Sequence, residues 1–251
     1  MKNTLIFTLI FLSVTSIFAQ ETFLSKQKNY SRVRQAVADK EKIITENLTK
    51  NGLATHNLHI LFAAYKSEKQ LEVYAKKKTE TEYKLLATYD ICASSGELGP
   101  KRQSGDGQVP EGFYKIDRFN PTSSFYLSLG INYPNQSDRK KSKASNLGGD
   151  IFIHGSCVTI GCLPMTDDKI KEIYLYAVYA KNNGQNDIPV YIFPFRMTDD
   201  KFENYKKQYE KNSELIDFWK NLKTGYDKFM LEKKALNVGV DKEGNYEYFL
   251  P

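Results

Sequence analysis

The residues best suited to chemistry in this sequence lie close together. His154, Cys157 and Cys162 fall within the stretch IFIHGSCVTIGCLP, which holds one of the three histidines and two of the three cysteines. Imidazole and thiol groups serve as metal ligands, as halves of a disulfide, or as a base with its nucleophile. Three kinds of site are therefore open, and each implies a different protein.

The metal and disulfide interpretations both depend on the remaining cysteine. A structural zinc site needs four ligands, usually with cysteines two to four residues apart. Cys162 lies five positions after Cys157, and the only other cysteine is Cys92, so a site with three cysteines and one histidine is possible by residue count but lacks a second closely spaced ligand pair. A disulfide between Cys157 and Cys162, or between Cys92 and Cys157, would leave one thiol free. The sequence does not decide which pair forms.

A catalytic interpretation singles out Cys162. It follows Gly161 in a Thr-Ile-Gly-Cys turn that we expect directly before a helix. The N–H groups at a helix start lower a thiol pKa and can bind an oxyanion. Gly161 permits close approach of a substrate carbonyl, and His154, at the end of a strand, would act as the base. An inert buried cysteine is the structural alternative.

The N-terminus predicts export. Lys2 precedes an apolar run from Leu5 to Ile17, and Ala19 is a suitable cleavage point for a signal peptide. The run is short for a membrane span, which needs about 20 residues. We therefore expect an exported protein of the periplasm or cell envelope, with no stable membrane span after cleavage. The net charge of +6 is diffuse and does not indicate nucleic-acid binding.

Hydrophobic periodicity predicts the elements that carry these residues. Helical spacing appears over 29–50, from Thr166 to Asn182, and over 199–236 with a break at Gly225 and the KNSE stretch. Alternation and aromatic content predict strands over 57–65, 71–77, 83–93, 113–121, 124–134, 151–155 and 188–195. A glycine-rich loop (94–112) and a basic loop or flap (137–150) lie between strands, and the tail reads as a hairpin turning at 242–245.

The segment His154 to Cys162, read as H-G-x-C-V-[ST]-x-G-C, resembles the active-site signature of L,D-transpeptidase (YkuD-type) catalytic domains, most closely the YafK-like branch. Further segments are similar in the same order: ICASSGELGPK, GDGQVPEGFY, FNPTSSFYLS with INYPN, and IPVYIFPFRM. Together they cover residues 58–197. A chance match would not produce five similar segments in the same order along the chain.

The resemblance implies an α+β protein, a mixed β-rich L,D-transpeptidase-like fold with flanking helices and a helical C-terminal extension. We expect residues 1–19 to be the signal peptide, 20–56 an N-terminal helical segment, 57–197 the catalytic domain, and 198–251 the extension with its terminal hairpin. Cys162 would be the nucleophile and His154 the general base. Gly161, Thr159 and Gly155 would shape the turn and the oxyanion site. No metal or organic cofactor is expected.

Two departures from the longer signature S-H-G-C-[IV]-R affect the expected site. Ile160 replaces the second histidine, which leaves His154 as the base, and Pro164 replaces the arginine. Another cation must then meet the substrate carboxylate, and Lys101, Arg102 and Arg139 are the candidates. The resemblance also places Gly105, Asp106, Gln108 and Glu111 beside the cleft.

The implied function is that of an exported cysteine enzyme acting on peptidoglycan stem peptides. It would form a thioester at the L-centre of the third residue, diaminopimelate, and transfer the acyl group to an amine. A hydrolytic amidase or carboxypeptidase of the same family, releasing diaminopimelate-linked groups such as an envelope protein, is one alternative. A non-catalytic peptidoglycan-binding envelope protein is another.

Overall fold

The computed structural model describes residues 21–249, so the predicted signal peptide lies outside the described residues. Its elements, in chain order, are α1 (Phe23–Lys28), α2 (Ser31–Lys50), β1 (Leu58–Tyr65), β2 (Gln70–Lys77), β3 (Lys84–Asp90), β4 (Gly112–Asn120), β5 (Ser128–Ile131), α3 (Gln136–Lys141), β6 (Phe152–His154), β7 (Leu163–Pro164), α4 (Asp167–Asn182), β8 (Pro189–Phe193), α5 (Asp199–Gln208), α6 (Ser213–Glu232), β9 (Asn237–Val240) and β10 (Tyr246–Phe249).

A mixed eight-stranded sheet forms the body of the molecule, with the strand order β3-β2-β1-β8-β4-β5-β6-β7. Strands β1 and β8 pair in parallel, as do β6 and β7, and the other neighbours are antiparallel. Strands β9 and β10 form a separate two-stranded sheet. The mixed sheet with segregated helices confirms the predicted α+β class.

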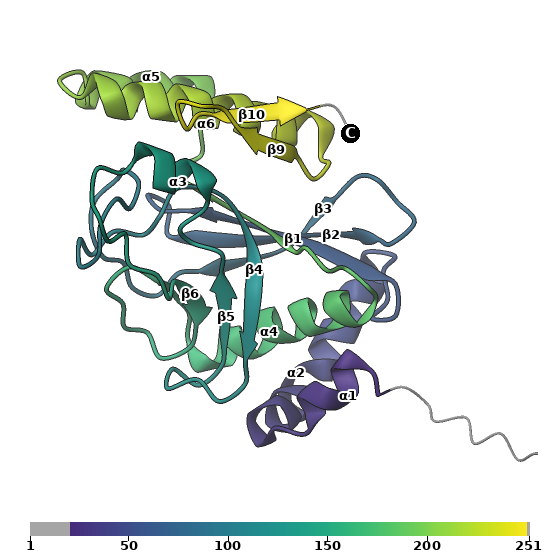
Figure 1. Ribbon diagram of the computed structural model, residues 1–251. Helices are drawn as coiled ribbons and strands as arrows, with labels where there is room; N and C mark the ends of the chain where they lie inside the picture. Colours follow the sequence, from purple (N-terminus) through teal and green to yellow (C-terminus); the bar gives the residue numbers. More distant parts are fainter. Residues whose placement is uncertain (1–20, 250–251) are drawn as a thin grey trace, which may run out of the picture.

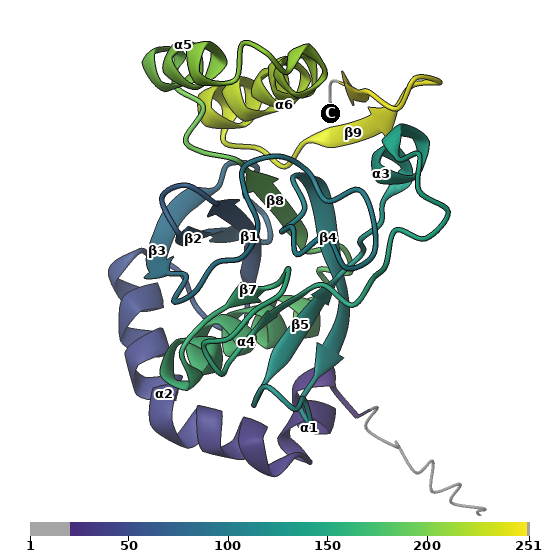
Figure 2. The ribbon, with the colours of Figure 1, turned by 90° about the vertical axis from the view of Figure 1, so that its left-hand side faces the viewer.

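Helices cover both faces of the large sheet. Figures 1 and 2 show α4 with α2 and α1 on one side, and α5, α6 and the terminal hairpin on the other. The central strand β1 alternates accordingly: Ile60 and Phe62 belong to the core shared with α2 and α4, whereas Leu61 and Tyr65 belong to the core shared with α6. A strand buried on both faces is apolar at nearly every position.

Most predicted elements are confirmed within a few residues. The helix expected over 29–50 is α2, and it ends before Gly52, whose φ of 70° favours glycine. Thr166 caps α4 as predicted: its hydroxyl accepts a hydrogen bond from the Lys169 amide. The terminal hairpin is present as β9 and β10, whose turn spans 241–245.

Two local predictions were wrong. The basic segment expected as a loop contains α3, whose capping box pairs the Asn135 and Asp138 side chains with each other's backbone amides. Gly225 does not break a helix; it lies inside α6 because an added Cβ would collide with Tyr248 and Phe113, so its missing side chain permits close packing. The break predicted at the KNSE stretch (211–214) is confirmed, because α5 ends at Gln208 and α6 begins at Ser213.

None of the helices described between residues 21 and 249 combines the length and the apolarity of a membrane span.

Candidate active site

Strands β6 and β7 bring the predicted nucleophile and base to the same side of the sheet. The two strands pair in parallel, with Ile153 opposite Leu163. Residues paired this way point to one face, and their neighbours point to the other. His154 and Cys162, each next to one of that pair, therefore share the opposite face. The Phe152 amide lies 3.4 Å from Cys162 Sγ, which confirms that the thiol faces β6.

The backbone around Cys162 forms a turn held by Thr159. The Thr159 hydroxyl accepts hydrogen bonds from the Gly161 amide at 3.1 Å and the Cys162 amide at 2.7 Å, and it donates to the Cys162 carbonyl at 3.0 Å. Gly161 has a φ of 135°, a conformation that side chains disfavour. The turn thus depends on Thr159 and Gly161. To stabilise an oxyanion, the Gly161 and Cys162 amides would have to release the Thr159 hydroxyl and bind a substrate oxygen in its place.

The expectation that Cys162 directly precedes a helix was wrong. Strand β7 follows it, and α4 begins only at Asp167. Burial raises the pKa of the Cys162 thiol; the nearby Phe152 amide and Lys101 oppose that rise, and Asp150 adds to it. Without a helix terminus beside it, the thiol is protonated at neutral pH and needs a base to remove its proton.

The surroundings of His154 fix its ring and its tautomer. Its ring is 2% exposed and lies 4.6 Å, between centroids, from the ring of Phe125. Nδ1 contacts the Gly155 carbonyl, which can only accept, so Nδ1 carries the proton and Nε2 carries the lone pair. Burial lowers the pKa of His154 against the smaller opposing effect of that hydrogen bond, so the ring is neutral at pH 7.

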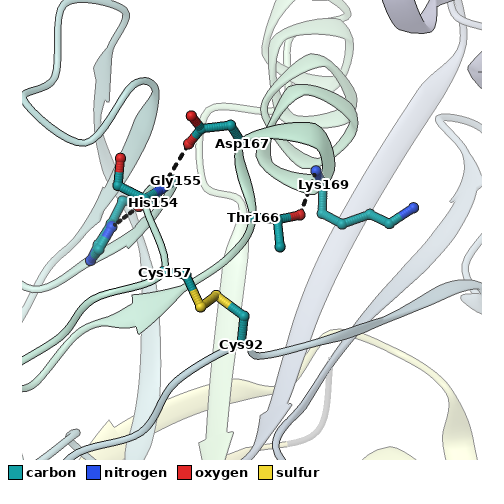
Figure 3. The surroundings of a disulfide bond; sticks show 8 residues. Cys92, His154, Gly155, Cys157, Thr166, Asp167 and Lys169 are labelled. Atoms are coloured by element: carbon teal, nitrogen blue, oxygen red, sulfur yellow. Dashed lines mark hydrogen bonds between the residues drawn. A yellow bond between two sulfur atoms is a disulfide. The ribbon is translucent and has the colours of Figure 1, made fainter.

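The other two cysteines form the disulfide Cys92–Cys157, and Cys162 is the free thiol among the described residues. Of the pairings that the sequence left open, the structure contains the one that joins distant segments. Figure 3 shows the bond between the end of β3 and the loop after His154. The two joined sulfurs are no longer thiolates, so they are not metal ligands in this state, and no cluster of three or more metal-binding side chains occurs in the described part of the chain.

Asp167 is a site residue that the sequence reasoning missed. Its carboxylate accepts a hydrogen bond from the Ser156 amide at 2.8 Å, which Figure 3 draws (Ser156 itself is not labelled there). Ser156 has a φ of 57°, and Gly155 has no room for a Cβ beside Asp167 and Phe125. The first turn of α4 therefore fixes the loop after His154. The M-T-D sequence behind the signature was the available signal.

A pocket of about 190 Å³ opens beside Cys162. It lies between the β1–β2 turn and the glycine-rich loop, and its lining residues include Lys66, Lys69, Ser95, Glu97 and Cys162. Ala93, Leu98 and Val109 add an apolar part to its wall. The site thus has a free thiol at the edge of an open pocket with both charged and apolar surfaces, as substrate pockets commonly do.

The three cations proposed for the substrate carboxylate do not line this pocket. Lys101 is 4% exposed, and its ammonium binds Asp106 at 2.6 Å and the Gln103 carbonyl at 2.8 Å. Arg102 pairs with Asp138 at 3.0 Å. Arg139 is exposed on the last turn of α3. Lys101 is close enough to lower the pKa of Cys162, but its own donors are directed elsewhere.

The remaining predicted residues organise the glycine-rich loop. Asp106 accepts from Lys101 and from the Arg102, Gln103 and Gln108 amides; burial opposes these bonds, but together they lower the pKa of Asp106. Gly105 lies in that turn with a φ of 75°. The Gln108 carbonyl would lie 3.1 Å from a Cβ on Gly161, so this loop packs directly on the nucleophile turn.

Glu111 is 0% exposed and connects the loop to distant elements. One carboxylate oxygen accepts from Lys66 at 2.9 Å and from the Gly99 amide at 2.7 Å. The other accepts from the Trp219 indole on α6 at 2.8 Å. Its role in this geometry is to anchor the loop, and Lys66 and Trp219 are two partners that the sequence reasoning did not identify.

The family model described as the L,D-transpeptidase catalytic domain (YkuD) matches residues 60–192. Over 178 residues the chain is 42% identical to YafK of Escherichia coli K12 and equally to that of Escherichia coli O157:H7; the match covers 70% of this chain and 68% of each relative. Both relatives carry an L,D-transpeptidase name.

Two solved structures are also similar. The helical cell shape determining protein Pgp2 of Campylobacter jejuni matches with a TM-score of 0.43 and 18% identity over 73% of each chain. Bd1075 of Bdellovibrio bacteriovorus matches with a TM-score of 0.38 and 20% identity, over 64% of this chain and 56% of that one. The family match spans more than half of the 251 residues, so the chain belongs to the L,D-transpeptidase (YkuD) catalytic domain family.

Proposed function

We propose that the protein is an exported cysteine acyltransferase of peptidoglycan, with Cys162 as nucleophile and His154 as general base. The observation that carries the proposal is the pairing of one free thiol with one oriented neutral imidazole on the same sheet face. Family membership supports the reaction class. The signal-like N-terminus and the disulfide, which forms in oxidising compartments, support export.

In the first half-reaction, His154 Nε2 takes the thiol proton as Cys162 Sγ attacks an amide carbonyl. The carbonyl belongs to the L-centre of the third residue of a stem peptide, usually diaminopimelate. The tetrahedral intermediate then collapses: the carbon–nitrogen bond breaks, and the imidazolium returns its proton to the leaving amine. The product is a thioester on Cys162 and a released amine.

In the second half-reaction, an amine of another stem peptide attacks the thioester. His154 takes a proton from that amine, a new amide bond forms, and the thiolate leaves and regains its proton. Water in place of the amine gives the hydrolytic variant with the same residues. Both variants share every step on the protein, so the acceptor must be identified by its product.

Mass spectrometry of muropeptides incubated with the purified protein tests this proposal. New crosslinks between third residues identify the transferase, and shortened stems or released diaminopimelate adducts identify the hydrolase. Cys162→Ala is expected to abolish both kinds of product, because no other thiol is free. A Cys162→Ala protein that still alters muropeptides would overturn the proposal.

The control is the double variant Cys92→Ser/Cys157→Ser, which removes the disulfide but leaves Cys162. We expect it to retain appreciable activity below its unfolding temperature. Binding of muropeptides without any turnover by the unmodified protein would instead identify the non-catalytic envelope protein.

A further inference from the structure

The Cys162 pocket contains charged groups that the proposed reaction does not use. Lys66, Lys69 and Glu97 are the ionisable residues among its lining side chains besides Cys162. The family's arginine position holds Pro164, and Lys101, Arg102 and Arg139 are absent from the wall. Any carboxylate of the substrate that enters this pocket must therefore be met by Lys66 or Lys69.

All the hydrogen-bond donors of the Lys66 ammonium group are already used. An ammonium group has three N–H donors. Those of Lys66 are directed to the Gly99 carbonyl at 2.7 Å, the Val109 carbonyl at 2.9 Å and Glu111 at 2.9 Å. Its charge is balanced by the buried Glu111 carboxylate. Lys66 therefore stabilises the loop and has no donor left for a ligand.

Lys69 is the free cation of the pocket. Its ammonium makes no hydrogen bond or ion pair with any residue between 21 and 249. Its backbone is nevertheless fixed in the β1–β2 turn, with a φ of 52° and with its carbonyl accepting from the Ile91 amide at 2.7 Å. Because the turn is fixed to both strands, it holds the backbone of Lys69 at the wall of the pocket.

Ser95 supplies a second unused donor on the same wall. Its hydroxyl oxygen is buried and has no hydrogen-bond partner in the described structure. Buried hydroxyls are nearly always paired, because an unpaired one loses its hydrogen bonds to water without replacement. A ligand oxygen in this pocket would satisfy it.

From these contacts we propose that the Cys162 pocket is a carboxylate-binding subsite, in which Lys69 supplies the charge and Ser95 a hydrogen bond. The ligand class is the acyl-donor peptide of the proposed function, bound through the free carboxylate of its third residue. The inference rests on that function for the identity of the ligand, but the anion site itself does not. Lys69 and Ser95 are thus specificity-determining residues of this pocket.

Alkylation of Cys162 tests the anion site without any peptidoglycan. Iodoacetate carries a carboxylate and iodoacetamide does not, and Cys162 is the free thiol in the disulfide-bonded protein. The ratio of the two alkylation rates therefore reports whether the pocket attracts or repels an anion. Lys69→Gln is expected to lower the iodoacetate-to-iodoacetamide ratio about three- to fivefold, the size of one partly screened charge, and Ser95→Ala to lower it less.

Two further variants provide the matched controls. Lys26→Gln makes the same change in net charge on α1, outside the pocket, and should leave the ratio unchanged. Glu97→Gln removes the acidic side chain of the same pocket and should raise the ratio. An equal ratio in Lys69→Gln and Lys26→Gln would overturn the proposal, whatever the enzyme's activity.

The second experiment compares donor peptides with a free or an amidated carboxylate on the third residue. Lys69→Gln should raise KM for the free-carboxylate donor with little change in kcat, and it should not affect the amidated donor. Equal KM effects on both donors contradict the subsite. If no variant, including the unmodified protein, forms a thioester with either donor, the proposed function fails while the alkylation ratio still decides the anion site.

Discussion

Burial shifts the two groups that we propose to react in opposite directions, raising the pKa of Cys162 and lowering that of His154. Each shift favours the uncharged form, because a low-dielectric surrounding disfavours charge on either group. The resting pair is therefore a thiol and a neutral imidazole. This pair differs from a preformed thiolate–imidazolium pair, since the proton moves only as the substrate carbonyl is attacked.

The pH profile of acylation should reflect this resting state. Below its pKa His154 is protonated and cannot accept the thiol proton, so the rate should fall on the acid side. Because burial lowers that pKa, the midpoint should lie below the ordinary value of about 6.5. The rate should show no loss on the alkaline side up to at least pH 8, because deprotonating Cys162 does not remove the nucleophile.

Single-turnover thioester formation followed by mass spectrometry from pH 5 to pH 9 would measure the profile. His154→Gln should remove the acid limb and lower the rate by about a hundredfold or more. Rapid alkylation of Cys162 that is already maximal at pH 6 would contradict this account, since it would reveal a thiolate in the resting enzyme.

At the scale of the elements, the C-terminal extension is joined to the active-site loop by one buried carboxylate. Glu111 holds the Gly99 amide on the loop, Lys66 at the β1–β2 turn and the Trp219 indole on α6. Helix α6 also packs Phe218, Trp219 and Leu222 onto the sheet face opposite α4. The extension thus covers that face and fixes the loop that lines the Cys162 pocket.

Trp219→Phe tests this connection between α6 and the loop. The substitution keeps an aromatic ring but removes the indole donor, which leaves one buried oxygen of Glu111 unpaired. We expect a loss of about 1–3 kcal/mol in the free energy of unfolding, measured by urea denaturation, together with faster hydrogen exchange at the Gly99 amide.

Lys220→Gln is the matched control for this prediction. Lys220 is the next residue of α6 and pairs with Asp217 at the surface, so its replacement should change the unfolding free energy by less than about 0.5 kcal/mol. Unchanged exchange at Gly99 in Trp219→Phe would show that α6 does not hold the loop.

At the scale of the whole molecule, two cores on opposite sheet faces share the strands β1 and β8. The Cys92–Cys157 bond adds a covalent link between the end of β3 and the loop before the nucleophile, 65 residues apart in sequence. Strands β3 and β7 are the two edges of the large sheet, and the Cys92 amide reaches the Pro164 carbonyl of β7 at 3.0 Å. The sheet is thus curled so that its edges meet at the active site.

Loss of the disulfide should therefore lower the free energy of unfolding substantially while leaving most of the catalytic rate. A loop of this length constrains the unfolded chain by about 4 kcal/mol in the chain-entropy model. Thermal unfolding of the oxidised protein with and without dithiothreitol would measure the change, and the Cys92→Ser/Cys157→Ser variant should match the reduced protein. A reduced protein with an unchanged melting temperature would contradict this expectation.

The local pattern was sufficient to predict most elements and to single out His154 and Cys162 as the candidate pair. Alternation located β1, β2 and β3, and the cap at Thr166 located α4, because these signals act over a few residues. The signature around His154 and Cys162 indicated the family. The two-residue strand β7 and the helix α3 were missed, because one is too short for periodicity and the other begins with polar residues that resemble a loop.

The sequence by itself determined the family and the candidates for nucleophile and base. It also showed that three cysteines cannot all pair within one chain, so at least one thiol must stay free. Only the tertiary structure decided which cysteines pair, because Cys92 and Cys157 meet only when the sheet edges do. It also decided that Lys101 and Arg102 are engaged by Asp106 and Asp138, whereas the Lys69 side chain, in the wall of the Cys162 pocket, has no partner among residues 21–249. Whether a charged side chain is available depends on the partners that folding brings to it, and those partners are distant in sequence.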